Sequence, residues 1–165
     1  GYAISAIVGK REIMEAAQKT FISSTFWTER IGPAAALATL DAMEKMRSWE
    51  IITLTGQQIK KRWQELADRN RIDIVLWGLP ALAGFSFKST KNLAYKTYIT
   101  QEMLAKGFLA GTSIYVSIAH TSEVLNAYFA ELEPLFSAIH NFEEGQDVFS
   151  FLKGPVCHDG FKRLN

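Results

Sequence analysis

The chain has 165 residues, of which 48% are hydrophobic and 21% charged. These values lie close to globular averages and exclude a disordered chain, a collagen and a coiled coil. The 18 basic and 17 acidic side chains leave a net charge of +1, which gives no reason to expect a nucleic-acid or membrane partner. The length suits one ordinary domain, or a larger one with a small neighbour.

Cys157 is the only cysteine, so an intrachain disulfide and a cysteine-based zinc site are excluded. We expect a cytoplasmic protein, because a chain without disulfides suits a reducing compartment. His120, His140 and His158 share no metal-ligand spacing, and no metal site is predicted. His158 is adjacent to Cys157, but adjacency in sequence does not make a nucleophile pair. We expect His120 to serve capping or core hydrogen bonding, with substrate binding as the alternative.

The first third of the chain predicts alternating strands and helices. Residues 2–8 mix β-branched and small side chains and predict a short strand. Residues 11–19 predict a helix, and the aromatic and hydroxyl residues 20–27 predict a second strand. A further helix starts near Gly32-Pro33, where proline costs no hydrogen bond. Its early turns are apolar nearly all round, which predicts burial from several sides.

The middle of the chain predicts a helix and a hairpin. Apolar residues recur at helical spacing over residues 54–69, whose other face is basic. Residues 72–77 and 82–88 predict two strands joined by a turn at residues 78–81. The predicted domain boundary lies around residues 47–55 and separates residues 1–50 from residues 51–165.

The last third predicts helices around one more strand. Residues 94–106 predict a helix closed by Gly107, and residues 108–117 predict a strand. Thr121 is the expected N-cap of a helix over residues 121–139. Residues 143–152 predict a short final helix. We expect an α/β fold in which the later two long helices cover one face of a small three-stranded sheet, because their apolar stripes need a common partner.

Hydroxyl residues at positions 23–25 stand before the very apolar helix. Such residues either cap a helix or help to bind a phosphate, because the N–H groups and the dipole of a helix N-terminus favour an anion. The sequence pattern alone does not distinguish helix capping from phosphate binding.

The stretch SSTFWTERIGPAAALATL (residues 23–40) resembles the segment after the active-site lysine in class III pyridoxal-phosphate (PLP) aminotransferases, which include glutamate-1-semialdehyde aminomutase. Residues 37–40 match the end of the family's helix, and counting back places Thr25 on the family's threonine. The opening residues 1–9 resemble the strand that follows the family's Schiff-base lysine. Residues 117–121, SIAHT, resemble the small-domain motif Ser-x-Ala-His-Thr.

The resemblance implies an α/β fold that is the C-terminal part of a fold-type I PLP transferase. Residues 1–50 would end the large PLP-binding domain and include a connecting helix, and residues 51–165 would form the small domain. It also implies PLP as cofactor, a homodimer with shared active sites, and small-molecule amino donors and carbonyl acceptors. Thr25 would hydrogen-bond the cofactor phosphate of the neighbouring subunit, and Ser24 would add its backbone N–H.

No catalytic residue is predicted in this chain. The family pattern places the imine-forming lysine about five residues before Gly1, so the resemblance implies a C-terminal portion that is inactive alone. Ala3 replaces the family's usual proline, and residues 27–30 replace Ser-Gly-Asn-Pro. Thr112 stands where some aminomutases carry a glutamate, which disfavours that reaction.

The sequence therefore predicts a portion of an aminotransferase that moves an amino group from a donor to an aldehyde or ketone. A glutamate-1-semialdehyde-type 2,1-aminomutase is one alternative. A non-catalytic α/β module for binding or dimerisation is the alternative from another class.

Overall fold

The computed structural model describes residues 2–22 and 25–160. The chain divides into two compact units, Gly1–Ser48 and Trp49–Asn165. We describe each unit by itself and call them unit 1 and unit 2.

Unit 1 contains less regular structure than the sequence predicts. The helix expected over residues 11–19 is confirmed as α1 (Arg11–Met14) continued by the 3₁₀ helix η1 (Glu15–Lys19). Residues 2–10 form no strand, and the described part of residues 20–27 contains only bends, turns and irregular chain. Both predicted strands are therefore wrong. A strand needs a neighbour to pair its N–H and C=O groups, and unit 1 offers none among its described residues.

Helix α2 (Ile31–Met46) confirms the apolar helix that was predicted to start near Pro33. It ends at Arg47, whose φ of 48° is left-handed. The predicted burial is wrong for this chain, because none of the helix's side chains is buried. Leu37 and Leu40 are 64% and 59% exposed. The helix therefore carries an apolar face that the other described residues of unit 1 leave exposed.

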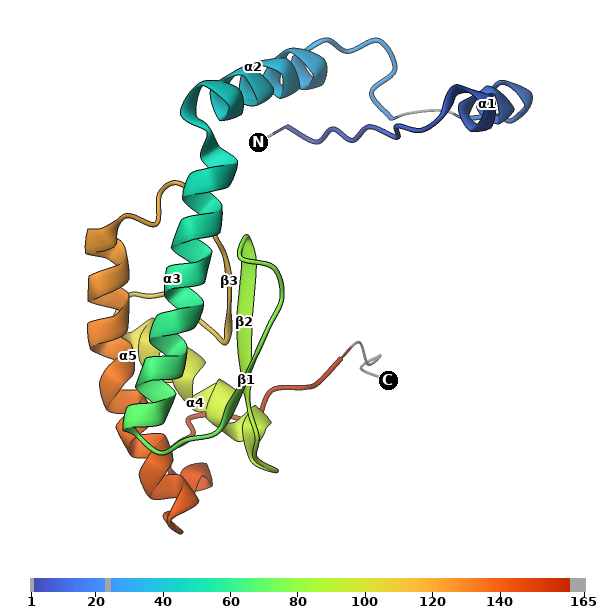
Figure 1. Ribbon diagram of the computed structural model, residues 1–165. Coiled ribbons are helices and arrows are strands. Elements are labelled where there is room, and N and C mark those ends of the chain that lie inside the picture. The colour runs from blue at the N-terminus through green and yellow to red at the C-terminus, as the bar shows by residue number, and fades with distance from the viewer. Residues whose placement is uncertain (1, 23–24, 161–165) are drawn as a thin grey trace. The chain divides into compact units, whose positions relative to one another are not determined.

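Unit 2 combines three long helices with a small sheet, and this confirms the α/β class (Figure 1). Its elements in chain order are α3 (Ser48–Arg69), β1 (Ile74–Trp77), β2 (Leu82–Phe87), α4 (Asn92–Ala105), β3 (Ser113–Tyr115), α5 (Ser122–Glu143) and the 3₁₀ helix η2 (Val148–Phe151). The sheet has the order β1-β2-β3 and is antiparallel throughout.

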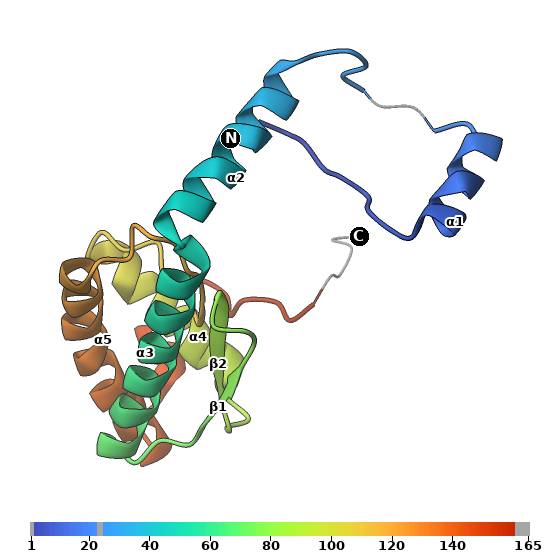
Figure 2. The same ribbon diagram turned by 45° about the horizontal axis from the view of Figure 1, so that its top comes forward.

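The sheet buries one face against the helices, as predicted. Ile74 pairs with Phe87, and Leu76 with Phe85, so these side chains share one face. The alternate residues Val75 and Trp77 are 45% and 42% exposed on the other face. Figures 1 and 2 show α3, α4 and α5 together on one side of the strands.

An aromatic cluster fills the space between sheet and helices. The ring of Phe85 lies 4.9 Å from that of Trp63 in α3 and 5.8 Å from that of Phe136 in α5, between ring centroids. Phe87 contacts Tyr95 of α4 edge to face at 5.4 Å. Each long helix of unit 2 thus contributes an aromatic side chain to the buried face of β2.

Three boundaries differ from the prediction. Helix α3 starts at Ser48, six residues before the predicted start at residue 54. Strand β3 covers only Ser113–Tyr115, because β2 pairs with it only over Leu82 to Gly84. Of the last predicted helix, residues 143–152, only the 3₁₀ helix η2 is present. Helix α5 runs on to Glu143, and the φ of 115° at Gly145 then separates the two elements.

Gly56 marks a close approach between α3 and the turn after β1. A Cβ added there would lie 2.0 Å from the backbone oxygen of Pro80. Glycine-to-alanine changes normally stabilise a helix interior by about 0.5–1 kcal/mol. We expect Gly56→Ala to lower the free energy of unfolding by about 1–3 kcal/mol instead, because backbone must move to accept the methyl group.

Urea unfolding of the two chains measures this difference. Gly32→Ala is the matched control, because its added Cβ would find only ordinary contacts at 3.5 Å or more. It should cause no loss of stability. A Gly56→Ala chain as stable as the wild type would contradict the described contact between α3 and Pro80.

Candidate functional site

Thr25 lies in an exposed turn of unit 1 that covers residues 25–28. Among the described residues, its hydroxyl has no hydrogen-bond partner, which leaves it available to a ligand. Ser24, the other predicted cofactor-binding residue, lies outside the described residues. Trp27, two residues on, has a φ of 45° and a side chain that is 81% exposed. A left-handed φ is costly for such a residue and is held at turns and functional loops.

The N-terminus of α2 follows this turn directly. The N-cap residue, Arg30, makes no side-chain hydrogen bond to the helix. Ala34 is the first residue whose backbone N–H donates to the helix, at the carbonyl oxygen of Arg30. The N–H groups of Ile31 and Gly32 therefore have no intrahelical partner, while Pro33 has no N–H. A hydroxyl and free backbone N–H groups are the donors that a phosphate accepts from proteins. The residues of this loop thus fit the phosphate of PLP.

The SIAHT motif of unit 2 forms a tight hydrogen-bonded turn at the start of α5. Ser117 donates its backbone N–H to Nδ1 of His120 at 3.0 Å, and its hydroxyl lies 3.1 Å from the same nitrogen. Thr121 caps α5 by accepting from the N–H of Val124 at 3.4 Å, as predicted. His120 therefore serves local hydrogen bonding, which was the favoured prediction.

Nδ1 of His120 lies close to three groups of Ser117, namely its backbone N–H at 3.0 Å, its hydroxyl at 3.1 Å and its carbonyl oxygen at 3.3 Å. The N–H can only donate and the carbonyl oxygen can only accept, so both tautomers of the ring find a partner in Ser117. Among the described residues, Nε2 is the ring nitrogen left open to a ligand.

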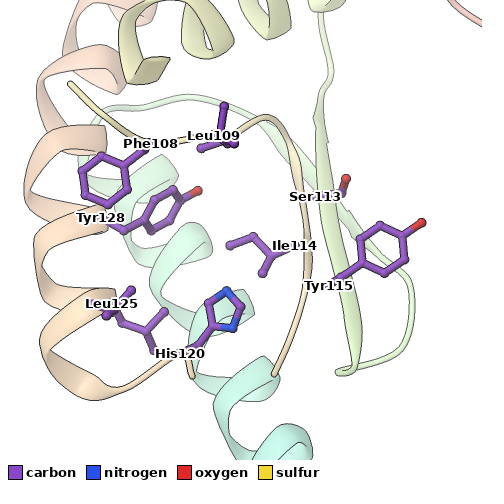
Figure 3. Close-up of a pocket in the computed structure, with 10 residues that line it drawn as sticks. Phe108, Leu109, Ser113, Ile114, Tyr115, His120, Leu125 and Tyr128 are labelled. Atoms are coloured by element: carbon purple, nitrogen blue, oxygen red, sulfur yellow. The ribbon is translucent and has the colours of Figure 1, made fainter. Parts of the chain in front are cut away.

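A groove of about 280 Å³ lies beside this turn, between the segment leading into β3 and helix α5 (Figure 3). The figure shows His120, Ile114, Leu125 and Tyr128 around its interior. Tyr115 is also at the groove but points away from those side chains. The sequence did not predict this groove, which depends on how residues 108–115 are placed over α5.

Cys157 has a structural role in the described chain. Its backbone N–H donates to the hydroxyl of Thr97 at 2.9 Å, and its thiol lies 3.6 Å from the carbonyl oxygen of Leu93. These contacts attach the C-terminal tail to α4. No group of three or more His, Cys, Asp or Glu side chains suited to a metal occurs within residues 2–22 and 25–160. No described helix is long and apolar enough to cross a membrane.

Comparison with known proteins identifies relatives, although no family model matches the chain. The chain is 31% identical over 137 residues to the 3-aminobutyryl-CoA aminotransferase of Cloacimonas acidaminovorans, a match that covers 79% of this chain and 33% of the relative. It is 26% identical to the 2'-deamino-2'-hydroxyneamine transaminase of Streptomyces kanamyceticus, over 82% of this chain and 36% of that protein. It is 25% identical to the glutamate-1-semialdehyde 2,1-aminomutase of Hyperthermus butylicus, over 84% and 37%.

The fold has a solved counterpart. The FumI protein of Sphingopyxis sp. MTA144, solved in its PLP internal aldimine form, superimposes with a TM-score of 0.73 at 17% identity. The match covers 87% of this chain and 35% of that protein. These comparisons confirm the resemblance to class III aminotransferases and aminomutases, and the fold of a C-terminal part of a fold-type I PLP transferase. The chain spans about one third of the length of the relatives it matches.

Proposed function

We propose that this chain is the C-terminal part of a PLP-dependent aminotransferase that acts on a small-molecule amino donor and an aldehyde or ketone acceptor. The observation that carries the proposal is the 31% identity to an aminotransferase over 79% of the chain. In this assignment residues 1–50 end the large cofactor-binding domain, and residues 51–165 form the small domain. The division of the chain after Ser48 supports that arrangement.

Thr25 and Ser24 are the residues that we assign to the cofactor phosphate. PLP, when bound, supplies the electron sink for amino-group transfer, and the protein supplies binding and orientation. The exposed hydroxyl of Thr25 would donate to a phosphate oxygen, and the backbone N–H of Ser24 would add a second donor. The positive end of the α2 dipole, which lies six residues after Thr25, would also favour the anion. These contacts would orient the cofactor.

The test is to replace Thr25 by alanine in the gene product that carries this sequence. We expect pyridoxamine phosphate to bind about 10- to 150-fold more weakly, because one charge-assisted hydrogen bond of about 1.5–3 kcal/mol is lost. The amine form of the cofactor is the sensitive probe, since it has no covalent link to the protein. Fluorescence titration gives the two dissociation constants.

Two further variants control this experiment. Thr25→Ser keeps a hydroxyl and should bind nearly as tightly as the wild type. Thr28→Ala removes an exposed hydroxyl from the same turn and should leave binding unchanged. Equal affinities for the wild type and Thr25→Ala would show that Thr25 does not bind the phosphate.

A 2,1-aminomutase is the second candidate, favoured by the match to the Hyperthermus butylicus enzyme. Thr112, where some aminomutases carry a glutamate, argues against it. The two reactions differ in their need for a second substrate, because a mutase moves the amino group within one molecule. Product formation without an added acceptor would identify a mutase. A gene product that binds neither PLP nor pyridoxamine phosphate would identify a non-catalytic module instead.

We further propose that the protein works as a cytoplasmic homodimer with shared active sites and has no nucleic-acid or membrane partner. The exposed apolar face of α2 supports an assembly, since Leu37 and Leu40 are more than half exposed. Apolar surface left open on a helix usually marks an interface. The balanced net charge of +1 supports the absence of nucleic-acid binding.

A further inference from the structure

The groove between the segment leading into β3 and helix α5 has an uncharged, mostly apolar lining. Its lining residues are Phe108, Leu109, Ala110, Ser113, Ile114, Tyr115, His120, Val124, Leu125 and Tyr128. None of them is a lysine, an arginine or an acidic residue. The volume of about 280 Å³ lies just below the range of about 300–1,000 Å³ that is typical of small-molecule sites.

Tyr128 brings a hydroxyl group with an unused proton to this groove. The Nε1–H of Trp63 donates to the Tyr128 oxygen at 3.1 Å. An indole N–H can only donate a hydrogen bond. The tyrosine is therefore the acceptor in that bond. Its own O–H proton has no acceptor among the described residues.

That proton is buried, because Tyr128 is only 5% exposed. Figure 3 shows the hydroxyl directed away from α5, and its oxygen accepts the hydrogen bond from Trp63 of α3. A buried donor without an acceptor is costly, and proteins rarely leave one unpaired. The Tyr128 O–H is therefore free to donate a hydrogen bond to an oxygen atom of a ligand in the groove.

His120 adds a second polar group to the groove. Its Nδ1 contacts Ser117, and its Nε2 has no partner among the described residues. Figure 3 places the ring next to Ile114 in the interior of the groove. The walls around these two polar side chains are apolar.

We propose that this groove binds a small uncharged carbonyl compound. The carbonyl oxygen accepts the Tyr128 hydroxyl proton, and the apolar body packs on Phe108, Ile114 and Leu125. A carboxylate fits less well, because no lining cation would offset the cost of removing its charge from water. This site is independent of the phosphate-binding role proposed for Thr25, so either proposal can fail without the other.

The test is a titration of the full chain with two probes, monitored by the chemical shifts of the backbone amides. The probes are acetophenone and α-methylstyrene, which have the same shape but differ in a carbonyl oxygen against a methylene group. We expect shifts at Phe108, Leu109 and Val124, and about tenfold tighter binding of acetophenone, since one hydrogen bond separates the probes. In Tyr128→Phe, acetophenone should lose that advantage while α-methylstyrene binds as before.

A second variant keeps the test decisive, because Tyr128→Phe also leaves the Trp63 N–H without an acceptor. Val124→Trp fills the groove from a side chain that is 44% exposed and leaves the Trp63–Tyr128 bond intact. It should abolish the shifts from both probes. Equal affinities of the two probes for the wild type, no binding of either, or shifts that survive Val124→Trp would overturn the proposal; the groove would then hold water only.

Discussion

Phe85→Ala should lower the free energy of unfolding by about 3–5 kcal/mol, the cost typical of removing a buried phenylalanine ring. Phe85 lies in the middle of β2 and is fully buried. Its ring contacts Trp63, Phe87 and Phe136 at centroid distances of 4.9, 5.5 and 5.8 Å. Truncation therefore opens a cavity at the point where the sheet meets α3 and α5.

Equilibrium urea unfolding of the wild type and the variant measures this loss. Val75→Ala, on β1, is the matched control, since Val75 is 45% exposed on the opposite face of the sheet. It should cost less than about 1 kcal/mol, because little apolar surface is removed from a packed environment. Similar losses for the two variants would show that the buried face of the sheet has been assigned wrongly.

The elements of unit 2 were predictable because their signals are local. Ile59, Trp63 and Leu66 recur at helical spacing along α3, and all three are buried. Residues 72–77 and 82–88 contain the observed strands β1 and β2, which are joined by the predicted turn. In each case the chain's own neighbours bury the apolar stripe, so periodicity and structure agree.

The strands predicted in unit 1 failed for a related reason. A strand is stabilised by a partner that is distant in sequence, and composition alone does not supply that partner. Residues 2–8 and 20–27 carry strand-forming side chains but have no strand beside them among the described residues. Helix α2 needs no partner for its own hydrogen bonds, so it forms even though its apolar face is uncovered.

The candidate sites differ in how they could be found. Thr25 was predictable only from the resemblance to a family, because its own neighbourhood also suits a helix cap. The groove beside His120 was missed, because Tyr128 lies on the apolar side of its helix and predicts an ordinary core residue. The hydrogen bond that indicates its role joins Tyr128 to Trp63, 65 residues away in the sequence. No local pattern reports a pairing across that distance.

Stability should fall steeply with pH above about 10, where tyrosines in an unfolded chain lose their protons. Burial raises the pKa of Tyr128 above its ordinary value, although the hydrogen bond from Trp63 acts in the other direction. Burial also raises the pKa of Tyr95, and the hydrogen bond that Tyr95 donates to Glu143 adds to the increase. Both groups therefore stay protonated in the folded chain at a pH that ionises them in the unfolded chain.

The sign of the effect follows from proton binding. Above about pH 10 the folded chain holds more protons than the unfolded chain, so rising pH favours unfolding. The contribution is fully present below about pH 10 and is lost as the pH rises toward the folded-state pKa. Tyr128 alone should give a slope of about 1.4 kcal/mol per pH unit. The loss from this residue then reaches about 3 kcal/mol by about pH 12.

Urea unfolding between about pH 8 and pH 11.5 measures this slope. Tyr128→Phe removes the ionisable group, so its stability should decline less steeply than that of the wild type by about 1.4 kcal/mol per pH unit. Phe129→Leu is the control, because it changes a neighbouring buried ring that cannot ionise. It should lower stability at every pH and keep the wild-type slope. A Tyr128→Phe chain with the full alkaline slope would show that the Tyr128 hydroxyl reaches water in the folded protein.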